Sequence, residues 1–274
     1  MYKNNILNLV LFLVVISLAS VIYFSEEEST ALDRLTTLEV ADIQSISIQH
    51  HSNTTAIEKQ ADGHWLITQP VKIAANDFRI NSVLELVSAP VHSRYPVNEI
   101  NLANIGLEKP VTTIAFDELS IAFGIVNPAT GLRYLRMGDS IYTIEDAYYP
   151  LLSSHFGTLV SLGLLPRDSR IEKLILLNQT IARDDKGFWQ SNIAIGADRI
   201  NETIDHWQSD QAFGVHSYLE REPLGEVFIY LENRQQPVSF IITDTDPWLI
   251  LARPEIGLEY HLAIEAYDKL ILAQ

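Results

Sequence analysis

The chain has 274 residues, 35 acidic side chains against 19 lysines and arginines, a formal net charge of −16 and no cysteine. The charge excludes a DNA- or RNA-binding protein, because such proteins hold phosphates through clustered Lys and Arg and this chain has no basic run. The lack of cysteine excludes disulfides, thiol nucleophiles and cysteine-containing metal sites. With 47% hydrophobic residues, the composition is that of a folded globular chain.

An apolar stretch without charge occupies residues 6–24 near the N-terminus. Its length is close to the roughly 20 residues that cross the hydrocarbon core of a bilayer. Lys3 precedes it and Glu26 to Glu28 follow it, which predicts a cytoplasmic tail at residues 1–5 and the remaining chain outside. The sequence therefore predicts a single-pass protein of a bacterial inner membrane, which contacts the lipid bilayer through residues 6–24 and has a periplasmic body.

A cleaved signal peptide is the alternative for this segment. Ser17-Leu18-Ala19 offers small residues two positions apart, as a cleavage site requires. The apolar run continues to Phe24, beyond the short hydrophobic region of a signal peptide, which favours an uncleaved anchor. Residues 25–41, acidic at first, are expected to form a stalk.

The body repeats itself. Four short motifs recur in the same order at offsets of 119 to 124 residues: Gly63-His64-Trp65 as Gly187-Phe188-Trp189, Arg79-Ile80-Asn81 as Arg199-Ile200-Asn201, Val91-His92-Ser93 as Val215-His216-Ser217, and Ala147-Tyr148 as Ala266-Tyr267. A fixed period indicates two copies of one structural unit. We therefore expect repeat one at residues 42–166 and repeat two at residues 167–274, with the junction at residues 164–169.

Each repeat is expected to contain two helices. The first has an apolar stripe at i, i+3, i+4 and i+7, namely Ile80, Val83, Leu84 and Val87 in repeat one and Ile200, Thr203, Ile204 and Trp207 in repeat two. Asn76 or Asp77 is the expected N-cap of the first copy and Asp198 that of the second. The second helix includes Tyr148, Leu151 and Leu152 in repeat one and Tyr267, Leu270 and Ile271 in repeat two.

Short runs of strand-forming residues surround these helices. They are Ile43–Gln49, Thr55–Lys59, Trp65–Thr68, Val111–Phe116, Ser120–Phe123, Tyr134–Met137 and Ser140–Ile144, and then Lys173–Leu177, Thr180–Arg183, Trp189–Ser191, Val227–Leu231, Val238–Thr243, Leu249–Ala252 and Leu258–Leu262. The connections are too short for parallel crossovers. The expected fold class is α+β: an N-terminal transmembrane helix, then two tandem repeats of antiparallel sheet packed with helices.

A family resemblance follows from several of these segments. They are residues 65–95, Ile105-Gly106-Leu107 with Pro110, Phe123-Gly124, Asn127-Pro128, Leu132-Arg133-Tyr134 and Tyr148-Tyr149-Pro150-Leu151-Leu152. Together they resemble an uncharacterised bacterial family known as a domain of unknown function, DUF forty-three-forty. The resemblance implies a membrane-anchored protein whose relatives accompany ABC-type transport components, including gliding-motility auxiliary proteins. It implies no catalytic residue.

Motifs for catalysis or cofactor binding are missing from the sequence. It has no nucleophile elbow, phosphate-binding loop, zinc-protease helix or dinucleotide fingerprint. His50 and His51 are adjacent on an expected strand and so point to opposite faces, which disfavours a shared metal ion. Asp244-Thr245-Asp246 and Asp184-Asp185-Lys186-Gly187 are expected to be turns. We therefore predict a protein that is not an enzyme, with no catalytic, cofactor-binding or metal site.

A turn-rich loop at residues 127–136 is the first predicted partner-binding surface. It brings Asn127, Arg133, Tyr134 and Arg136 into a strongly acidic protein, and Arg and Tyr are enriched at binding hot spots. The alternative is an ordinary hairpin with surface arginines. Trp248 is the other candidate, because Trp65 and Trp189 begin equivalent strands and Trp207 belongs to a helical stripe.

These observations predict a non-enzymatic, membrane-anchored periplasmic interaction or accessory module, serving an ABC-type transport or envelope complex. One alternative is a periplasmic module that binds a glycan or another ligand, with Trp248 as the aromatic platform. A second alternative is an envelope hydrolase without a recognisable motif.

Overall fold

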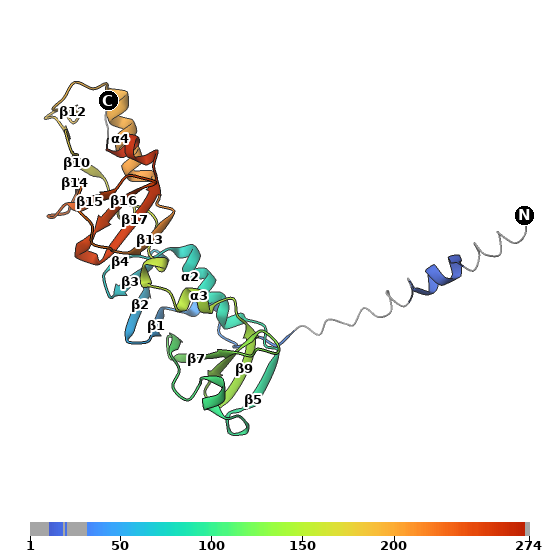
Figure 1. Ribbon diagram of the computed structural model, residues 1–274. Coiled ribbons are helices and arrows are strands. Elements are labelled where there is room, and N and C mark those ends of the chain that lie inside the picture. The colour runs from blue at the N-terminus through green and yellow to red at the C-terminus, as the bar shows by residue number, and fades with distance from the viewer. Residues whose placement is uncertain (1–10, 19, 21–31, 272–274) are drawn as a thin grey trace, which may run out of the picture.

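The computed structural model describes residues 11–18, 20 and 32–271, and its body is an α+β fold, mainly β, in which two antiparallel sheets carry a few helices. The two sheets follow one another along the body (Figure 1). Residues 11–18 are helical, and no helix within the described residues is long and apolar enough to cross a membrane. The rest of the predicted span at residues 6–24, apart from residue 20, lies outside the described residues.

The first sheet has nine strands in the order β4-β3-β2-β1-β6-β7-β8-β9-β5. Their bounds are β1 Ser45–His50, β2 Asn53–Lys59, β3 Trp65–Gln69, β4 Ile73–Ala74, β5 Ser93–Pro96, β6 Thr112–Phe116, β7 Leu119–Val126, β8 Leu132–Met137 and β9 Ser140–Glu145. The helices of this half are α2 (Asp77–Leu84) and α3 (Tyr149–Leu152), with 3-10 turns η1 Val40–Asp42, η2 Glu85–Ser88, η3 Val97–Glu99, η4 Leu102–Ile105 and η5 Phe156–Leu159.

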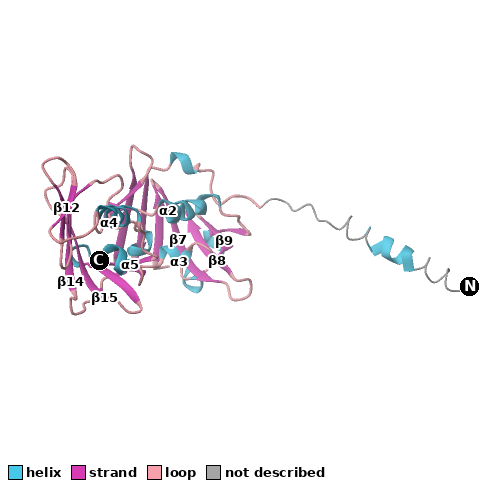
Figure 2. Cartoon of the chain, turned by 90° about the horizontal axis from the view of Figure 1, so that it is seen from above, coloured by secondary structure: helices cyan, strands magenta, loops and turns pink. Residues whose placement is uncertain are grey.

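The second sheet has eight strands in the order β12-β11-β10-β14-β15-β16-β17-β13. Their bounds are β10 Ile171–Ile175, β11 Thr180–Arg183, β12 Trp189–Ser191, β13 Gly214–Ser217, β14 Gly225–Leu231, β15 Val238–Asp244, β16 Trp248–Arg253 and β17 Leu258–Ala263. The helices of this half are α4 (Ala197–Ser209) and α5 (Ala266–Leu270), with the 3-10 turn η6 at Pro254–Ile256. In Figure 2 the labelled helices α2, α3, α4 and α5 lie over the strands.

The two sheets have the same order of strands once the short edge strand β4 is set aside. In each sheet three strands form one side, the next four follow in chain order, and the strand after the long helix returns to the far edge as β5 or β13. Ile80 and Ile200 occupy the matching helices and are 0% and 3% exposed. The two halves of the body thus have the same topology.

The predicted helical stripes are confirmed, because all eight of their side chains are buried. Asn76 caps α2, since its side chain accepts a hydrogen bond from the backbone N–H of Arg79. The predicted cap at Asp198 is wrong: Gly196 is the N-cap residue of α4 and Asp198 lies inside its first turn. A glycine leaves the chain free to enter the helix from an extended conformation, and the acidic side chain one turn in still complements the helix dipole.

All predicted strands are present, with ends that differ by a few residues. The predicted equivalence of His92 and His216 is wrong, because His92 precedes β5 whereas His216 lies within β13.

A connecting segment, residues 159–163, joins the two halves. The backbone N–H of Asn76 donates to Leu159 O and that of Ser161 donates to Ala74 O, while the N–H of Ala212 donates to Leu162 O. One short piece of chain therefore pairs first with the β4 edge of the first sheet and then with the residues just before β13.

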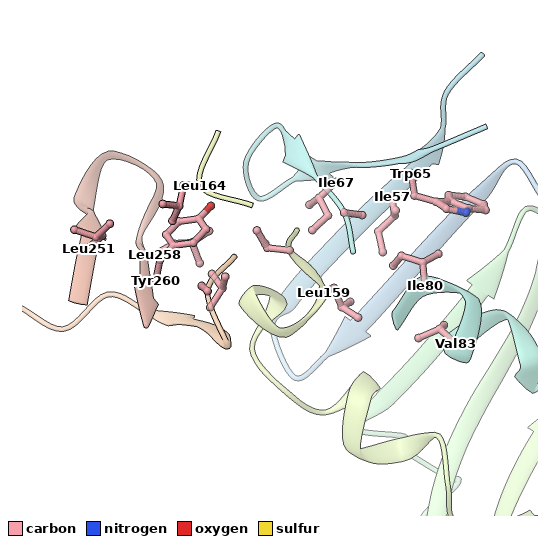
Figure 3. Close-up of a cluster of buried hydrophobic side chains, with 14 of the residues drawn as sticks. Ile57, Trp65, Ile67, Ile80, Val83, Leu159, Leu164, Leu251, Leu258 and Tyr260 are labelled. Atoms are coloured by element: carbon pink, nitrogen blue, oxygen red, sulfur yellow. The ribbon is translucent and has the colours of Figure 1, made fainter. Parts of the chain in front are cut away.

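The hydrophobic core continues across this junction. Figure 3 shows Leu251, Leu258 and Tyr260 on the side of the second half, and Ile67 and Leu159 on the side of the first. Because all of these side chains belong to one buried cluster, burial of apolar surface holds the two halves together.

The folded body begins before the predicted boundary at residue 42. Leu35 is 3% exposed, and the backbone N–H groups of Leu35 and Thr36 donate to Ala89 O and Val87 O. These residues, which the sequence assigned to the stalk, therefore belong to the folded first half. They pair with the residues before β5 in the way that the connecting segment pairs with the residues before β13.

Candidate functional site

Each sheet has a face that is not covered by its long helix, called here the outer face. On the second sheet, Ala252 and His216 both pair with Glu259, and Trp248 lies two residues from Ile250, which pairs with His261. Because side chains alternate along a strand, this register places one set of residues together on the outer face: His216, Trp248, Ala252, Glu259 and His261. The intervening Leu249, Leu251 and Tyr260 point to the core and are at most 1% exposed.

On the first sheet the crossover from β5 to β6 closes the outer face. Residues 97–111 form this crossover, and its Ile105 and Leu107 pack on Ile141 of β9 in a small separate core. The contact is close: a Cβ atom at Gly124 of β7 would overlap the carbonyl oxygen of Ile105. Apolar packing thus covers the outer face of the first sheet around Ile141.

On the second sheet the corresponding crossover, residues 218–224 between β13 and β14, is less than half as long. It crosses the sheet with polar anchors instead of an apolar core. The backbone N–H of Tyr218 donates to Gly257 O, that of Leu224 donates to Ile242 O, and Arg221 pairs with Glu259. Such a short crossover leaves part of the outer face uncovered.

Glu259 is the central anchor of the short crossover and is 1% exposed. Arg221 donates to both of its carboxylate oxygens at 2.7 and 3.2 Å, and the backbone N–H of Leu219 donates to Oε2 at 3.0 Å. His261 Nε2 lies 2.8 Å from Oε1. Burial would raise the pKa of Glu259, but these hydrogen bonds and the Arg221 charge hold it below its ordinary value. Glu259 is therefore a carboxylate at neutral pH.

Beside this anchor lies a partly exposed cluster of four rings, called here the aromatic patch: Phe213, His216, Trp248 and His261. Phe213 and Trp248 are 53% and 48% exposed, and their ring centroids are 5.5 Å apart at an interplanar angle of 70°. His261 lies 4.5 Å from His216 and 6.2 Å from Phe213, centroid to centroid. Two large aromatic side chains are thus exposed to solvent, and contacts with neighbouring rings hold them in place.

The imidazole of His216 is uncharged at neutral pH. Burial is the largest cause that lowers its pKa, and the nearby His261 and Arg79 lower it further against the opposing effect of Glu259. Burial and then His216 likewise lower the pKa of His155. His216 therefore adds an uncharged ring to the apolar rings of Phe213 and Trp248 at neutral pH.

The surface role predicted for Arg133 rests on a wrong premise, because this residue is only 8% exposed. Its guanidinium donates to Asp146 Oδ1 at 2.6 Å and Oδ2 at 3.0 Å, donates to Gly124 O, and stacks on Tyr149 with 3.7 Å to the ring centroid. All of these partners are within the first half. Arg133 is a buried structural arginine and its side chain is not open to a partner.

The other predicted partner-binding residues lie in two separate places. Asn127 donates to the Tyr134 hydroxyl at 2.9 Å, and Tyr134 packs in the small core under the long crossover. Arg136 is half-buried and its Nε donates to Gly138 O. Trp248 is exposed on the other sheet, so the structure does not bring it together with the loop at residues 127–136.

Sequence reasoning missed Phe213, Arg221, Glu259 and His261 as neighbours of Trp248. They come from three segments, which only the strand register brings next to Trp248. One signal was present: the stretch between the end of β13 and the start of β14 is much shorter than its counterpart in the first half.

The smaller motifs form turns. Asp184 Oδ1 accepts hydrogen bonds from the N–H groups of Lys186 and Phe188, and Gly187 has a positive φ of 85°. Asp244 Oδ1 accepts from the next two N–H groups. His50 Nδ1 lies 2.7 Å from Thr112 Oγ1, and no group of three acidic or histidine side chains among residues 11–18, 20 and 32–271 is arranged to hold a metal ion.

Comparison of the chain with protein-family models, with curated proteins and with solved structures finds no match.

Proposed function

We propose that this protein is a non-enzymatic interaction module, and that the aromatic patch of its second sheet binds a protein partner. A large exposed apolar surface that is fixed by its neighbours is typical of a contact site. The patch has this character, because Phe213 and Trp248 are about half exposed yet each is in ring contact with His261.

The contrast between the two outer faces is the observation that carries the proposal. Ile141 and Glu259 occupy equivalent positions in the strand pairing of the two sheets. Ile141 is covered by Ile105 and Leu107, whereas Glu259 anchors a short crossover and leaves the neighbouring aromatic rings exposed. A chain that closes one outer face with its own residues and leaves the other open has a surface available for another molecule.

The ring geometry favours a protein over a glycan. Sugar rings stack on flat aromatic platforms, but Phe213 and Trp248 meet edge to face at 70°. Such a corner suits an apolar side chain inserted between the rings, as in the centre of a protein interface.

The wider proposal joins this surface to the membrane. Residues 6–24 anchor the chain in a bacterial inner membrane, the body lies in the periplasm, and the two sheets are tandem copies of one unit, of which the second has kept or gained the open face. The partner is then a membrane protein complex such as an ABC-type transporter. The shared strand order supports the tandem copies, and the resemblance of the sequence supports the membrane anchor and the transport partner.

The test is recovery of a partner from membranes by the full chain in mild uncharged detergent. A double variant, Phe213→Ala with Trp248→Ala, is expected to recover at least about tenfold less of a stoichiometric membrane protein than the wild type, because truncating central aromatic residues costs about 2 kcal/mol or more. The matched control is Phe78→Ala with Phe188→Ala, which removes two other exposed rings, 79% and 65% exposed.

The proposal fails if the control loses the partner equally, or if the wild type is recovered only by itself. The glycan alternative has its own measurement: a change in fluorescence on adding cell-wall fragments that is present in the wild type and lost in Trp248→Phe.

A further inference from the structure

A second recess, the junction cleft, lies where the two halves meet, away from the aromatic patch. It has a volume of about 490 Å³, within the range of small-molecule sites. Its walls come from residues 60–74 around β3 and β4, from residues 161–167, and from the second half through the turn after β14, the end of β16, η6 and β17. Because both halves build it, the cleft depends on how the two sheets are joined.

Positive charge gathers in this cleft, although the chain as a whole carries −16. Lys72, Arg167, Arg234 and Arg253 line it, against a single acidic lining residue, Asp62. Arg167 is held by Asp77 at 3.0 Å, and Arg253 by Glu255 at 2.8 Å. Four cations converge here from four separate segments of the chain.

Two of these cations are available to a ligand. Lys72 and Arg234 are exposed, and within the part of the chain that the structure describes their side chains make no hydrogen bond or ion pair. Two unpaired cations that face one recess attract an anion, and a guanidinium can bind a phosphate or carboxylate through two hydrogen bonds.

The floor of the cleft is apolar. Leu164 and Tyr260 are 2% and 1% exposed, and Figure 3 shows them side by side. Ile73 and Ile256 are half-buried and complete the floor. A ligand that fills the cleft therefore needs an apolar body as well as a charged group.

We propose that the junction cleft binds a small amphiphilic anion, whose phosphate or carboxylate lies between Lys72 and Arg234 and whose apolar body rests on Leu164 and Tyr260. The ligand contacts both halves, so its binding stabilises their junction. This site is independent of the aromatic patch and of the partner proposed for it.

The test is calorimetric titration of the full chain in uncharged detergent. Naphthyl phosphate is expected to bind, inorganic phosphate to bind more weakly, and the uncharged naphthyl glucoside to bind at least tenfold more weakly. Dihexanoyl phosphatidic acid distinguishes the sources of this chemistry: if it binds at least as tightly as naphthyl phosphate the site fits a lipid headgroup, and if it binds more weakly the site fits a soluble anion.

The double variant Lys72→Ala with Arg234→Ala is expected to weaken naphthyl phosphate binding at least tenfold. Its control, Lys109→Ala with Lys269→Ala, removes the same charge from exposed positions outside the cleft and is expected to bind as the wild type does. Failure of naphthyl phosphate to bind, equal binding of the glucoside, or equal weakening by both double variants would each overturn the proposal. None of these outcomes bears on the partner of the aromatic patch.

Discussion

Arg133→Ala is expected to lower the free energy of unfolding by about 2 to 3 kcal/mol, whereas Arg136→Ala, three residues along the same strand, is expected to change it by no more than about 0.5 kcal/mol. The first substitution leaves the Asp146 carboxylate without its two hydrogen bonds and removes the cation from the ring of Tyr149. Asp146 keeps 30% of its side-chain exposure, so water recovers part of the loss and the lower end of the range for buried pairs applies.

Chemical denaturation of the two full-length variants measures this difference, and a double-mutant cycle with Asp146→Ala isolates the pair. We expect a coupling energy above about 1 kcal/mol for Arg133 with Asp146. Equal free energies of unfolding for the Arg133 and Arg136 variants would show that the buried ion pair does not stabilise the fold.

Glu259→Gln is expected to destabilise the protein by about 3 kcal/mol, the largest effect of a single charge that the structure predicts. The substitution keeps the shape of the side chain but removes the charge that holds Arg221, His261 and the N–H of Leu219. Glu255→Gln is the matched control: its side chain is 47% exposed and pairs with Arg253, so a loss below about 1 kcal/mol is expected.

The pH dependence of stability has a definite sign at Glu259. Its folded pKa lies below the ordinary value of 4.5 because the hydrogen bonds and the charge of Arg221 outweigh the effect of burial. Its contribution is therefore complete above the unfolded pKa and is lost as the pH falls through the lower folded pKa. The wild type should lose more stability between neutral pH and pH 3 than Glu259→Gln does, and parallel pH profiles would contradict this account.

The strands could be predicted because their side chains alternate between a core and an outer face, as in β14, where Val227, Ile229 and Leu231 are buried. The same alternation contained the information that Arg133 is buried. Arg133 lies two residues before Leu135, so both point to the core, but the turn-rich loop before it suggested a surface. The position in the strand decides the burial of an arginine more than its residue type does.

The aromatic patch could be predicted only in part. The sequence indicates Trp248 because the other three tryptophans begin strands or belong to a helical stripe, and Trp248 is exposed in the structure. Phe213 precedes β13 and His261 belongs to β17, and no local pattern relates them to Trp248. Their proximity depends on long-range strand pairing, which sequence periodicity does not specify.

The junction cleft was beyond sequence reasoning for a similar reason. Its cations are isolated in the sequence, at positions 72, 167, 234 and 253, and none belongs to a basic run. Only the packing of the two halves brings them to one recess. A strongly acidic composition excludes a nucleic-acid surface but does not exclude a local basic site.

The most direct measurement for the central claim is photo-crosslinking in living cells with a benzophenone amino acid in place of Phe213, compared with the same amino acid in place of Phe78. Both positions are exposed, but only Phe213 belongs to the aromatic patch. One discrete crosslinked membrane protein is expected from position 213 and none from position 78. The same products from both positions, or none from position 213, would contradict it.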